Sequence, residues 1–217
     1  MTALLEPILR SPALERHIED LLRVRDEERR LREQFLHDMA DDRKMEFING
    51  EVIVHSPATL RHCDAVLALV QLLNAHVRSR KLGRVASEKL LVSLTRNDYE
   101  PDVCYYGPEK AQGLEPKEHR FPAPDMVVEV LSPSTEERDR GVKMEDYAEH
   151  GTGEYWIVDP DAETIEQYLL RDGAYDLSVK VREGTITSTV VPGFTIPVRA
   201  VFDAEENLAA LKRVIGA

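Results

Sequence analysis

The chain has 217 residues, of which 42% are hydrophobic and 31% are charged. That length builds one well-buried domain and is short for two, and the composition excludes a disordered or fibrous protein. Asp and Glu total 40 against 28 for Lys and Arg, so the formal net charge is −12. This acidic balance excludes a general nucleic-acid coat, and any contact with DNA has to be local.

The first part of the chain is dense in charge, and its apolar residues recur at steps of three and four between Leu14 and Met39. This spacing predicts an amphipathic helix or a broken pair of helices. Charged residues interrupt the apolar stripe, which disfavours a long coiled coil. We therefore predict a helical extension over residues 1–43, packed on the domain or on a second subunit, and a domain over residues 44–217. Packing on a second subunit would make the protein a homodimer, and the sequence does not decide between the two arrangements.

Cysteine usage and hydropathy indicate the compartment. Two cysteines are too few for a disulfide framework, and they fit a reducing environment. No window approaches the roughly eighteen apolar residues that a bilayer span needs, and no segment has the pattern of a secretory signal. We expect a cytoplasmic protein without membrane contact.

The predicted domain begins with a hairpin. Asn49-Gly50 stands between two short β-prone runs, and this dipeptide favours the two turn positions that need positive φ. Apolar residues at helical spacing then predict a helix over residues 60–80, with Thr59 as its N-cap. Alternating apolar residues predict a strand over residues 84–94, and a short strand follows over residues 103–106.

The second half of the domain alternates strands and helices. Residues 107–124 are rich in proline, glycine and charge, which is typical of a loop that serves as a lid or a connector. The nearly continuous apolar run over residues 125–131 predicts a central strand buried on both faces. A helix over residues 136–150, a second hairpin over residues 154–170 and short strands to residue 202 follow. The pattern predicts an α/β fold with a mixed central sheet flanked by helices.

Glu129 is the most informative residue, because it interrupts the apolar run of the predicted central strand. A buried carboxylate is costly unless a cation or a hydrogen-bond network compensates it. Two arrangements satisfy that requirement. Glu129 can form an ion pair with an internal Arg or Lys, or it can serve as a metal ligand.

Asp102 offers a second carboxylate, because it follows Pro101 at the start of a predicted short strand. If that strand pairs beside the strand of Glu129, both carboxylates can face one divalent ion. Mg²⁺ takes oxygen ligands and keeps several waters, so two carboxylates suffice when a substrate phosphate supplies the rest, and Mn²⁺ is a substitute. The alternative is structural, because Pro-Asp is common in turns.

Lys143 lies on the helix predicted after the strand of Glu129. A lysine near two carboxylates and a metal can position an attacking water, and its charge opposes the charge that grows on a pentavalent phosphorus. The alternative is a solvated lysine on a helix surface.

These residues belong to a pattern that resembles the Uma-type family of restriction endonucleases, within the PD-(D/E)xK nuclease superfamily. The similarity covers about residues 44 to 203. The segments that carry it are Pro101-Asp102, residues 129–135, Asp139-Arg140 with Lys143 and Tyr147, residues 154–160, residues 46–52, His62 and residues 191–194.

The resemblance implies a restriction-endonuclease-like core and Mg²⁺-dependent hydrolysis of a DNA phosphodiester. It implies that Asp102 and Glu129 bind the metal and that Lys143 is the catalytic lysine. The simplest superfamily pattern places the lysine two residues after the glutamate, where this chain has Leu131. A lysine on the next helix reaches the same space, because the C-terminal end of a strand and the following helix are neighbours in an α/β unit.

Glu46, Glu51 and His62 are secondary candidates for this site. Glu51 could add a metal ligand, and His62 could contact a phosphate or a water. The alternative for Glu46 and Glu51 is that they are exposed charges on the hairpin. The alternative for His62 is that it is a surface histidine at the start of a helix.

Two other functions remain open at this level. One is a catalytically silent module that assembles through its N-terminal helix, which the acidic balance favours. The other is a metal-dependent phosphoesterase for small molecules, which a closed pocket under the loop at residues 107–124 would favour.

Overall fold

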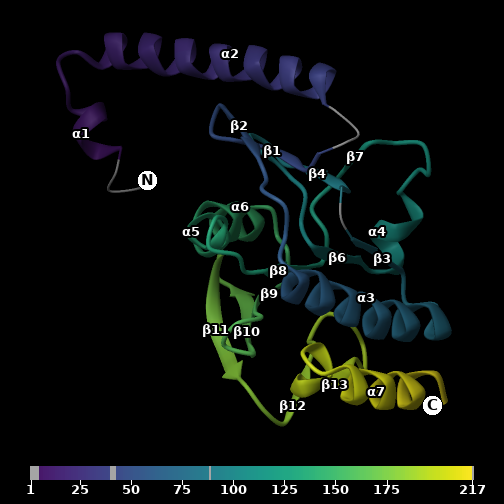
Figure 1. Cartoon of the computed structure of the whole chain (residues 1–217). Coiled ribbons are helices and arrows are strands. Elements are labelled where there is room, and N and C mark those ends of the chain that lie inside the picture. Colours follow the sequence, from purple (N-terminus) through teal and green to yellow (C-terminus); the bar gives the residue numbers. More distant parts are fainter. Residues whose placement is uncertain (1–4, 40–42, 88, 217) are drawn as a thin grey trace.

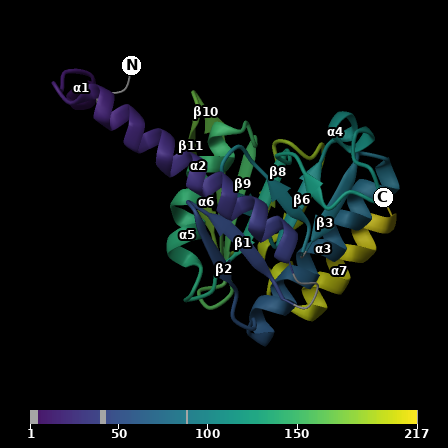
Figure 2. The ribbon, with the colours of Figure 1, turned by 90° about the horizontal axis from the view of Figure 1, so that it is seen from above.

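The computed structural model describes residues 5–39, 43–87 and 89–216, so parts of the predicted N-terminal extension lie outside the described residues. Two helices precede the sheets, α1 (Glu6–Leu9) and α2 (Leu14–Asp38). Figure 2 shows α2 crossing over the rest of the chain, with its N-terminal end and α1 projecting beyond it. The predicted helix is therefore confirmed as one helix that follows a short helical turn.

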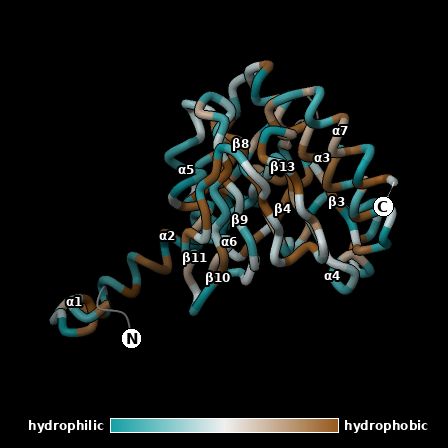
Figure 3. Tube along the Cα trace, turned by 90° about the horizontal axis from the view of Figure 1, so that it is seen from below, coloured by the Kyte–Doolittle hydropathy of each residue, from teal (hydrophilic) through white to brown (hydrophobic). Residues whose placement is uncertain are grey.

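The C-terminal end of α2 is fixed to the body of the protein. Phe35 is buried there, and the guanidinium of Arg32 donates hydrogen bonds to Asp98 Oδ1 and to the Leu94 carbonyl, each at 2.8 Å. The projecting end alternates hydrophilic and hydrophobic segments (Figure 3). Among the described residues, no helix is both long and apolar enough to cross a membrane.

A mixed sheet of six strands forms the centre, in the order β11-β10-β9-β8-β6-β3. Strands β8 and β9 are parallel and the other neighbours are antiparallel. The mixed central sheet and the second hairpin are thus confirmed. The strands are β3 (Arg84–Ser87), β6 (Val103–Tyr106), β8 (Met126–Val130), β9 (Glu154–Asp159), β10 (Thr164–Arg171) and β11 (Ala174–Val181).

A second sheet of five strands has the order β2-β1-β5-β4-β7. The predicted hairpin at Asn49-Gly50 is confirmed, with φ of 50° and 86° at the two turn residues. The prediction of a single strand over residues 84–94 is wrong. Strands β3 and β4 belong to different sheets, and Lys89 between them has a φ of 35°. The strands are β1 (Met45–Ile48), β2 (Glu51–Val54), β4 (Leu91–Ser93), β5 (Asp98–Tyr99) and β7 (Arg120–Phe121).

The helix predicted after Thr59 is confirmed as α3 (Leu60–Arg80), with the Thr59 hydroxyl accepting a hydrogen bond from the His62 backbone N–H. The loop predicted over residues 107–124 contains the short helix α4 (Pro108–Gln112) as well as β7. A small sheet of β12 (Thr185–Thr187) and β13 (Thr195–Pro197) and a 3₁₀ turn, η1 (Val198–Val201), come next. They are followed by α7 (Ala204–Gly216), which was not among the predicted elements. Figure 1 shows α7 beside α3.

The helix predicted over residues 136–150 is two helices, α5 (Glu136–Arg140) and α6 (Val142–Glu149). Gly141 separates them with φ −116° and ψ −108°, which is not helical. A Cβ at this position would lie 2.9 Å from the carbonyl oxygen of Glu137, so glycine permits the break. The break turns α6 relative to α5, with Lys143 in its first turn.

The two faces of the six-stranded sheet pack against different layers. Residues that alternate along β6, β8 and β9, including Val128 and Trp156, join a core with α3 and α7. The intervening residues, including Val127 and Tyr155, join a second core with the five-stranded sheet and Tyr147 of α6. Glu129 follows Val127 by two positions and therefore lies on the second face, toward β1 and α6.

An ion-pair group on β10 gives the fold a measurable pH dependence. Burial would raise the pKa of Glu166, but hydrogen bonds from Arg140, Tyr168 and Lys180 lower it from 4.5 to about 2. A carboxylate with a lowered folded pKa stabilises the fold above its unfolded pKa, and this stabilisation is lost as the pH falls through the folded value.

We expect Glu166→Gln to lower the free energy of unfolding at pH 7. The difference from the wild type should shrink as the pH falls from about 4.5 to about 2. Urea unfolding across this range measures it, with the exposed Glu115→Gln as the control. A difference that grows toward low pH would contradict the assignment.

Candidate functional site

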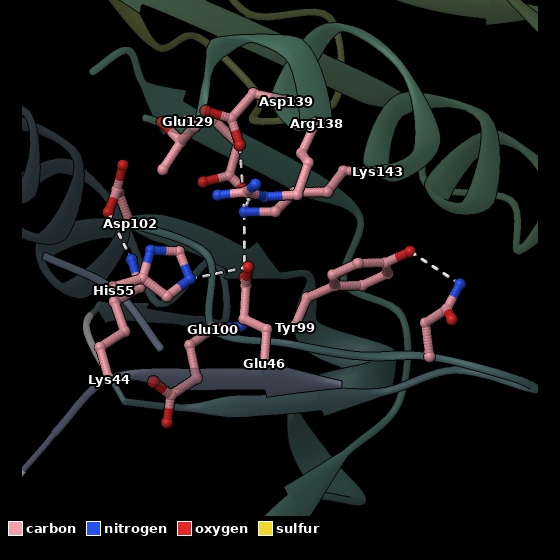
Figure 4. Close-up of polar contacts among 12 residues, drawn as sticks. Lys44, Glu46, His55, Tyr99, Glu100, Asp102, Glu129, Arg138, Asp139 and Lys143 are labelled. Atoms are coloured by element: carbon pink, nitrogen blue, oxygen red, sulfur yellow. Dashed lines mark hydrogen bonds and ion pairs between the residues drawn. The ribbon is translucent and has the colours of Figure 1, made fainter. Parts of the chain in front are cut away.

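Four buried side chains meet where the central sheet faces the five-stranded sheet. Lys143 of α6 is 1% exposed, and its Nζ lies 2.9 Å from Glu46 Oε1, 3.1 Å from Asp139 Oδ1 and 3.3 Å from Glu129 Oε1. Figure 4 shows Glu46 approaching the lysine from β1 and the other two carboxylates approaching from β8 and α5. We call Lys143, Glu46, Glu129 and Asp139 the lysine cluster.

Lys143 stays charged in this cluster. Burial alone would lower the pKa of its ammonium group, but the charges of Glu129 and Glu46 raise it well above the usual value. Three carboxylates surround this one ammonium group, so the lysine does not balance them all. Burial, together with the charges of Asp139 and Asp102, raises the pKa of Glu129 well above its usual value against the opposing charge of Lys143. The cluster can therefore accept further positive charge.

Asp102 lies beside this cluster at the start of β6. Its strand pairs with the strand of Glu129, since Val103 is opposite Val128 in antiparallel register, so the condition for the two carboxylates to face one ion is met. Asp102 Oδ2 accepts a hydrogen bond from the Val130 backbone N–H at 2.8 Å, which ties the carboxylate to the strand of Glu129.

The other oxygen of Asp102 faces a lysine and a histidine. Lys44 Nζ lies 2.8 Å from Oδ1, and His62 Nε2 lies 3.5 Å from the same oxygen. Burial would raise the pKa of Asp102, but His62 and Lys44 outweigh it and hold the pKa below its usual range. Asp102 is therefore ionised at neutral pH.

Glu46 is held in place from three directions. Its Oε2 lies 2.9 Å from His55 Nε2, and its Oε1 accepts a hydrogen bond from the Glu100 backbone N–H in addition to the contact with Lys143. Burial would raise the pKa of Glu46, but the charge of Lys143 and the hydrogen bond with His55 lower it to about 2. Its carboxylate is therefore fixed and charged.

A cavity of about 210 Å³ opens onto these groups. Asp102, Glu129, Asp139 and Lys143 all line it, so the three predicted catalytic residues share one accessible space. The loop after β8 and the segment before α3 form its rim, with residues 132–135 on one side and residues 56–59 on the other. We call it the catalytic cavity.

The structure places the three secondary candidates, Glu46, Glu51 and His62, differently. Glu46 belongs to the lysine cluster and His62 lines the catalytic cavity. Glu51 is exposed at the start of β2, opposite Ile48, and it is not among the described residues that line this cavity. The structure thus brings two of the three to the site.

Sequence reasoning missed three residues of the site, Lys44, His55 and Asp139. Asp139 precedes Lys143 by four positions, a spacing at which helical side chains meet, so this pairing was a usable signal. Lys44 and His55 lie just outside the two hairpin strands, where the His55 N–H donates to the Lys44 carbonyl. Hairpin register could have placed these two side by side, but not beside Asp102.

The fold and this site together define a nuclease-like protein with a mixed sheet and a carboxylate–lysine centre. Residues 32–199 match the Uma2 family, described as "Putative restriction endonuclease", and the chain belongs to this family. Membership supports a nuclease function and confirms the resemblance found in the sequence.

The fold is also similar to that of a solved protein from Anabaena variabilis, described as "a putative nuclease belonging to DUF820". The TM-score is 0.68 at 18% identity, over 82% of this chain and 97% of that one. The similarity shows a shared restriction-endonuclease-like fold. No curated protein gives a significant match.

The side chains at the site fit a hard divalent cation by their chemistry. Asp102 and Glu129 present carboxylate oxygens to one cavity, and Asp139, whose Oδ1 is ion-paired with Lys143, lines the same cavity. Over the same residues, no group of three or more His, Cys, Asp or Glu side chains is arranged to hold a metal by itself. Two carboxylates completed by waters and a substrate phosphate match the way Mg²⁺ is bound.

Proposed function

We propose that this protein is a Mg²⁺-dependent endonuclease that hydrolyses a DNA phosphodiester bond in the catalytic cavity. The observation that carries the proposal is the position of Lys143, a fully buried lysine that contacts three carboxylates and reaches the same cavity as Asp102. A structural ion pair needs one acid for one base, whereas this arrangement has a surplus of acids around one base.

Each residue of the site has a distinct role in this proposal. Asp102 and Glu129 would hold Mg²⁺, which when bound supplies charge neutralisation on the phosphate and lowers the pKa of a water. Lys143 orients the attacking water for in-line displacement, and its ammonium group opposes the negative charge that grows on the phosphate oxygens. Glu46 and Asp139 are positioning residues, because they fix the ammonium group of Lys143.

Incubation of supercoiled plasmid, linear duplex and single-stranded oligonucleotide with the purified protein tests the proposal. We expect cleavage of at least one of these DNA substrates with Mg²⁺ or Mn²⁺ and none with EDTA. Glu109→Gln, an exposed carboxylate on α4, should cleave like the wild type. Absence of cleavage by a folded protein at every metal concentration would overturn the proposal. It would favour the catalytically silent module that assembles through its N-terminal helix.

Calorimetric titration of Mg²⁺ tests the metal ligands without a substrate. We expect Glu129→Gln to weaken Mg²⁺ binding by more than about 10-fold, because the amide removes one charged oxygen ligand. Glu109→Gln again serves as the control. Equal affinity of the wild type and Glu129→Gln would exclude Glu129 as a ligand.

A further inference from the structure

A second and larger cavity, of about 450 Å³, lies beside the catalytic cavity. The two share Lys44, His55, His62 and Asp102 among their lining residues, so they adjoin along this row of side chains. We call the larger one the basic cavity. Nothing in the roles assigned to the lysine cluster uses it.

The charge of its lining distinguishes the basic cavity from the rest of an acidic chain. Arg43, Lys44 and Lys89 line it, and over residues 43–87 and 89–216 Asp102 is its one acidic lining residue. Arg43 and Lys89 each have a further interaction of their own, but guanidinium and ammonium groups carry donors for more than one partner. The chain has a formal net charge of −12, so a cavity with this lining is a local site for an anion.

The start of α3 adds to this preference. His62 lies in the first turn of this helix, lines both cavities and has a buried Nδ1 with no hydrogen-bond partner among the described residues. The N-terminus of a helix of this length favours an anion through its dipole. The helix N-terminus therefore supplies the preference for an anion at the boundary of the two cavities, and the His62 ring adds a polar group there.

Part of the remaining wall is apolar. Pro57, Ala58 and Val66 line it together with Cys63, and Ser56 adds a hydroxyl. A bare inorganic anion would leave these groups without a partner, whereas a sugar ring would cover them. The lining therefore matches a unit that joins a phosphate to an apolar-faced ring, as a nucleotide does.

We propose that the basic cavity binds a sugar–phosphate unit of the substrate strand next to the scissile bond. This inference rests on the proposed function, since it names the part of the DNA that lies beside the catalytic cavity. The cavity positions the strand through one phosphate and one sugar, while the lysine cluster acts on the neighbouring phosphate. Arg43 and Lys89 are binding residues in this arrangement, outside the lysine cluster.

Fluorescence anisotropy of a labelled DNA oligonucleotide without divalent metal tests the phosphate contact. We expect Arg43→Ala and Lys89→Ala each to weaken binding and to reduce the slope of log affinity against log salt. The double variant should reduce that slope by the value for one phosphate, about 0.9 for duplex or about 0.7 for a single strand. Lys212→Ala on α7, an exposed lysine that does not line the cavity, should leave the slope unchanged. Thermal unfolding checks that each variant is folded.

Cleavage kinetics separate this inference from the proposed function. Arg43→Ala and Lys89→Ala should raise KM by about 10-fold with kcat within about threefold of the wild type, since they remove binding shared by ground and transition states. Cleavage by the wild type together with unchanged KM and salt slopes in both variants would overturn the basic-cavity proposal alone. A wild type that neither binds nor cleaves DNA would instead overturn the proposed function.

Competition distinguishes a strand unit from a free anion. A non-cleavable dinucleotide should compete with labelled DNA at lower concentrations than inorganic phosphate, and Lys89→Ala should weaken both competitors, because both carry the phosphate that Lys89 contacts. If inorganic phosphate competes as well as the dinucleotide, the cavity recognises an anion only and the proposed sugar contact is wrong.

Discussion

Replacing Lys143 by alanine is expected to abolish DNA cleavage and to lower the free energy of unfolding by about 3–5 kcal/mol. The stability loss arises because Glu46, Glu129 and Asp139 would remain buried without their shared ammonium group. Without that charge the pKa of Glu46 would rise from about 2, and the pKa of Glu129, which burial already raises, would rise further. The penalty should therefore be larger at pH 7 than at pH 4, where carboxylates can protonate.

Urea unfolding followed by circular dichroism measures the stability loss, and plasmid cleavage measures the activity. Lys110→Ala is a matched control, because Lys110 forms a partly exposed ion pair with Asp125, for which we expect less than about 1 kcal/mol. The double variant Lys143→Met with Glu129→Gln should recover part of the stability and none of the activity. Cleavage by either Lys143 variant would refute the assigned role of this lysine.

Asp102→Asn is expected to reduce cleavage by more than about 100-fold while the protein stays folded. Asparagine keeps an oxygen that can accept the Val130 N–H, but it removes the charge that a metal ion and Lys44 both require. The effect should lie in kcat and in the affinity for Mg²⁺. Steady-state kinetics across a range of Mg²⁺ concentrations measure both.

Asp125→Asn is a close match as a control for Asp102→Asn. Asp125 also contacts a lysine, Lys110, at 2.9 Å and accepts a backbone hydrogen bond, from the Gly107 N–H at 2.6 Å. It lies outside the catalytic cavity, so its variant should keep the activity of the wild type. Equal activity of the two variants would show that the Asp102 carboxylate has only a structural role.

Local chemistry predicted much of the fold and part of the site. Asn49-Gly50, the Thr59 cap and the apolar run around Glu129 each act over a few residues, and the structure confirms the elements they indicate. The Asp102 strand also lies beside the Glu129 strand, which is the arrangement that a shared metal site requires. The contact between Lys143 and Glu129 follows from the short connection between strand and helix.

The features that could not be predicted from the sequence arise mainly from the packing of the five-stranded sheet. Glu46 reaches Lys143 only because β1 belongs to a separate sheet that packs against the central one, and no periodicity specifies that packing. The strand predicted over residues 84–94 was wrong for the same reason, since alternation continues while the chain changes sheets. The helix α7 was a different failure, because Leu208, Leu211 and Val214 stood at helical spacing in the sequence.

The single tryptophan of the chain gives this architecture a kinetic consequence. Trp156 is fully buried in β9, opposite Val128 of the strand that carries Glu129, and its ring stacks on Phe194. Its emission therefore reports the formation of the central sheet during refolding. Closure of the lysine cluster requires segments far apart in sequence, and such contacts of high contact order form slowly. The delay between recovery of tryptophan emission and recovery of cleavage would time the docking of the hairpin onto the sheet.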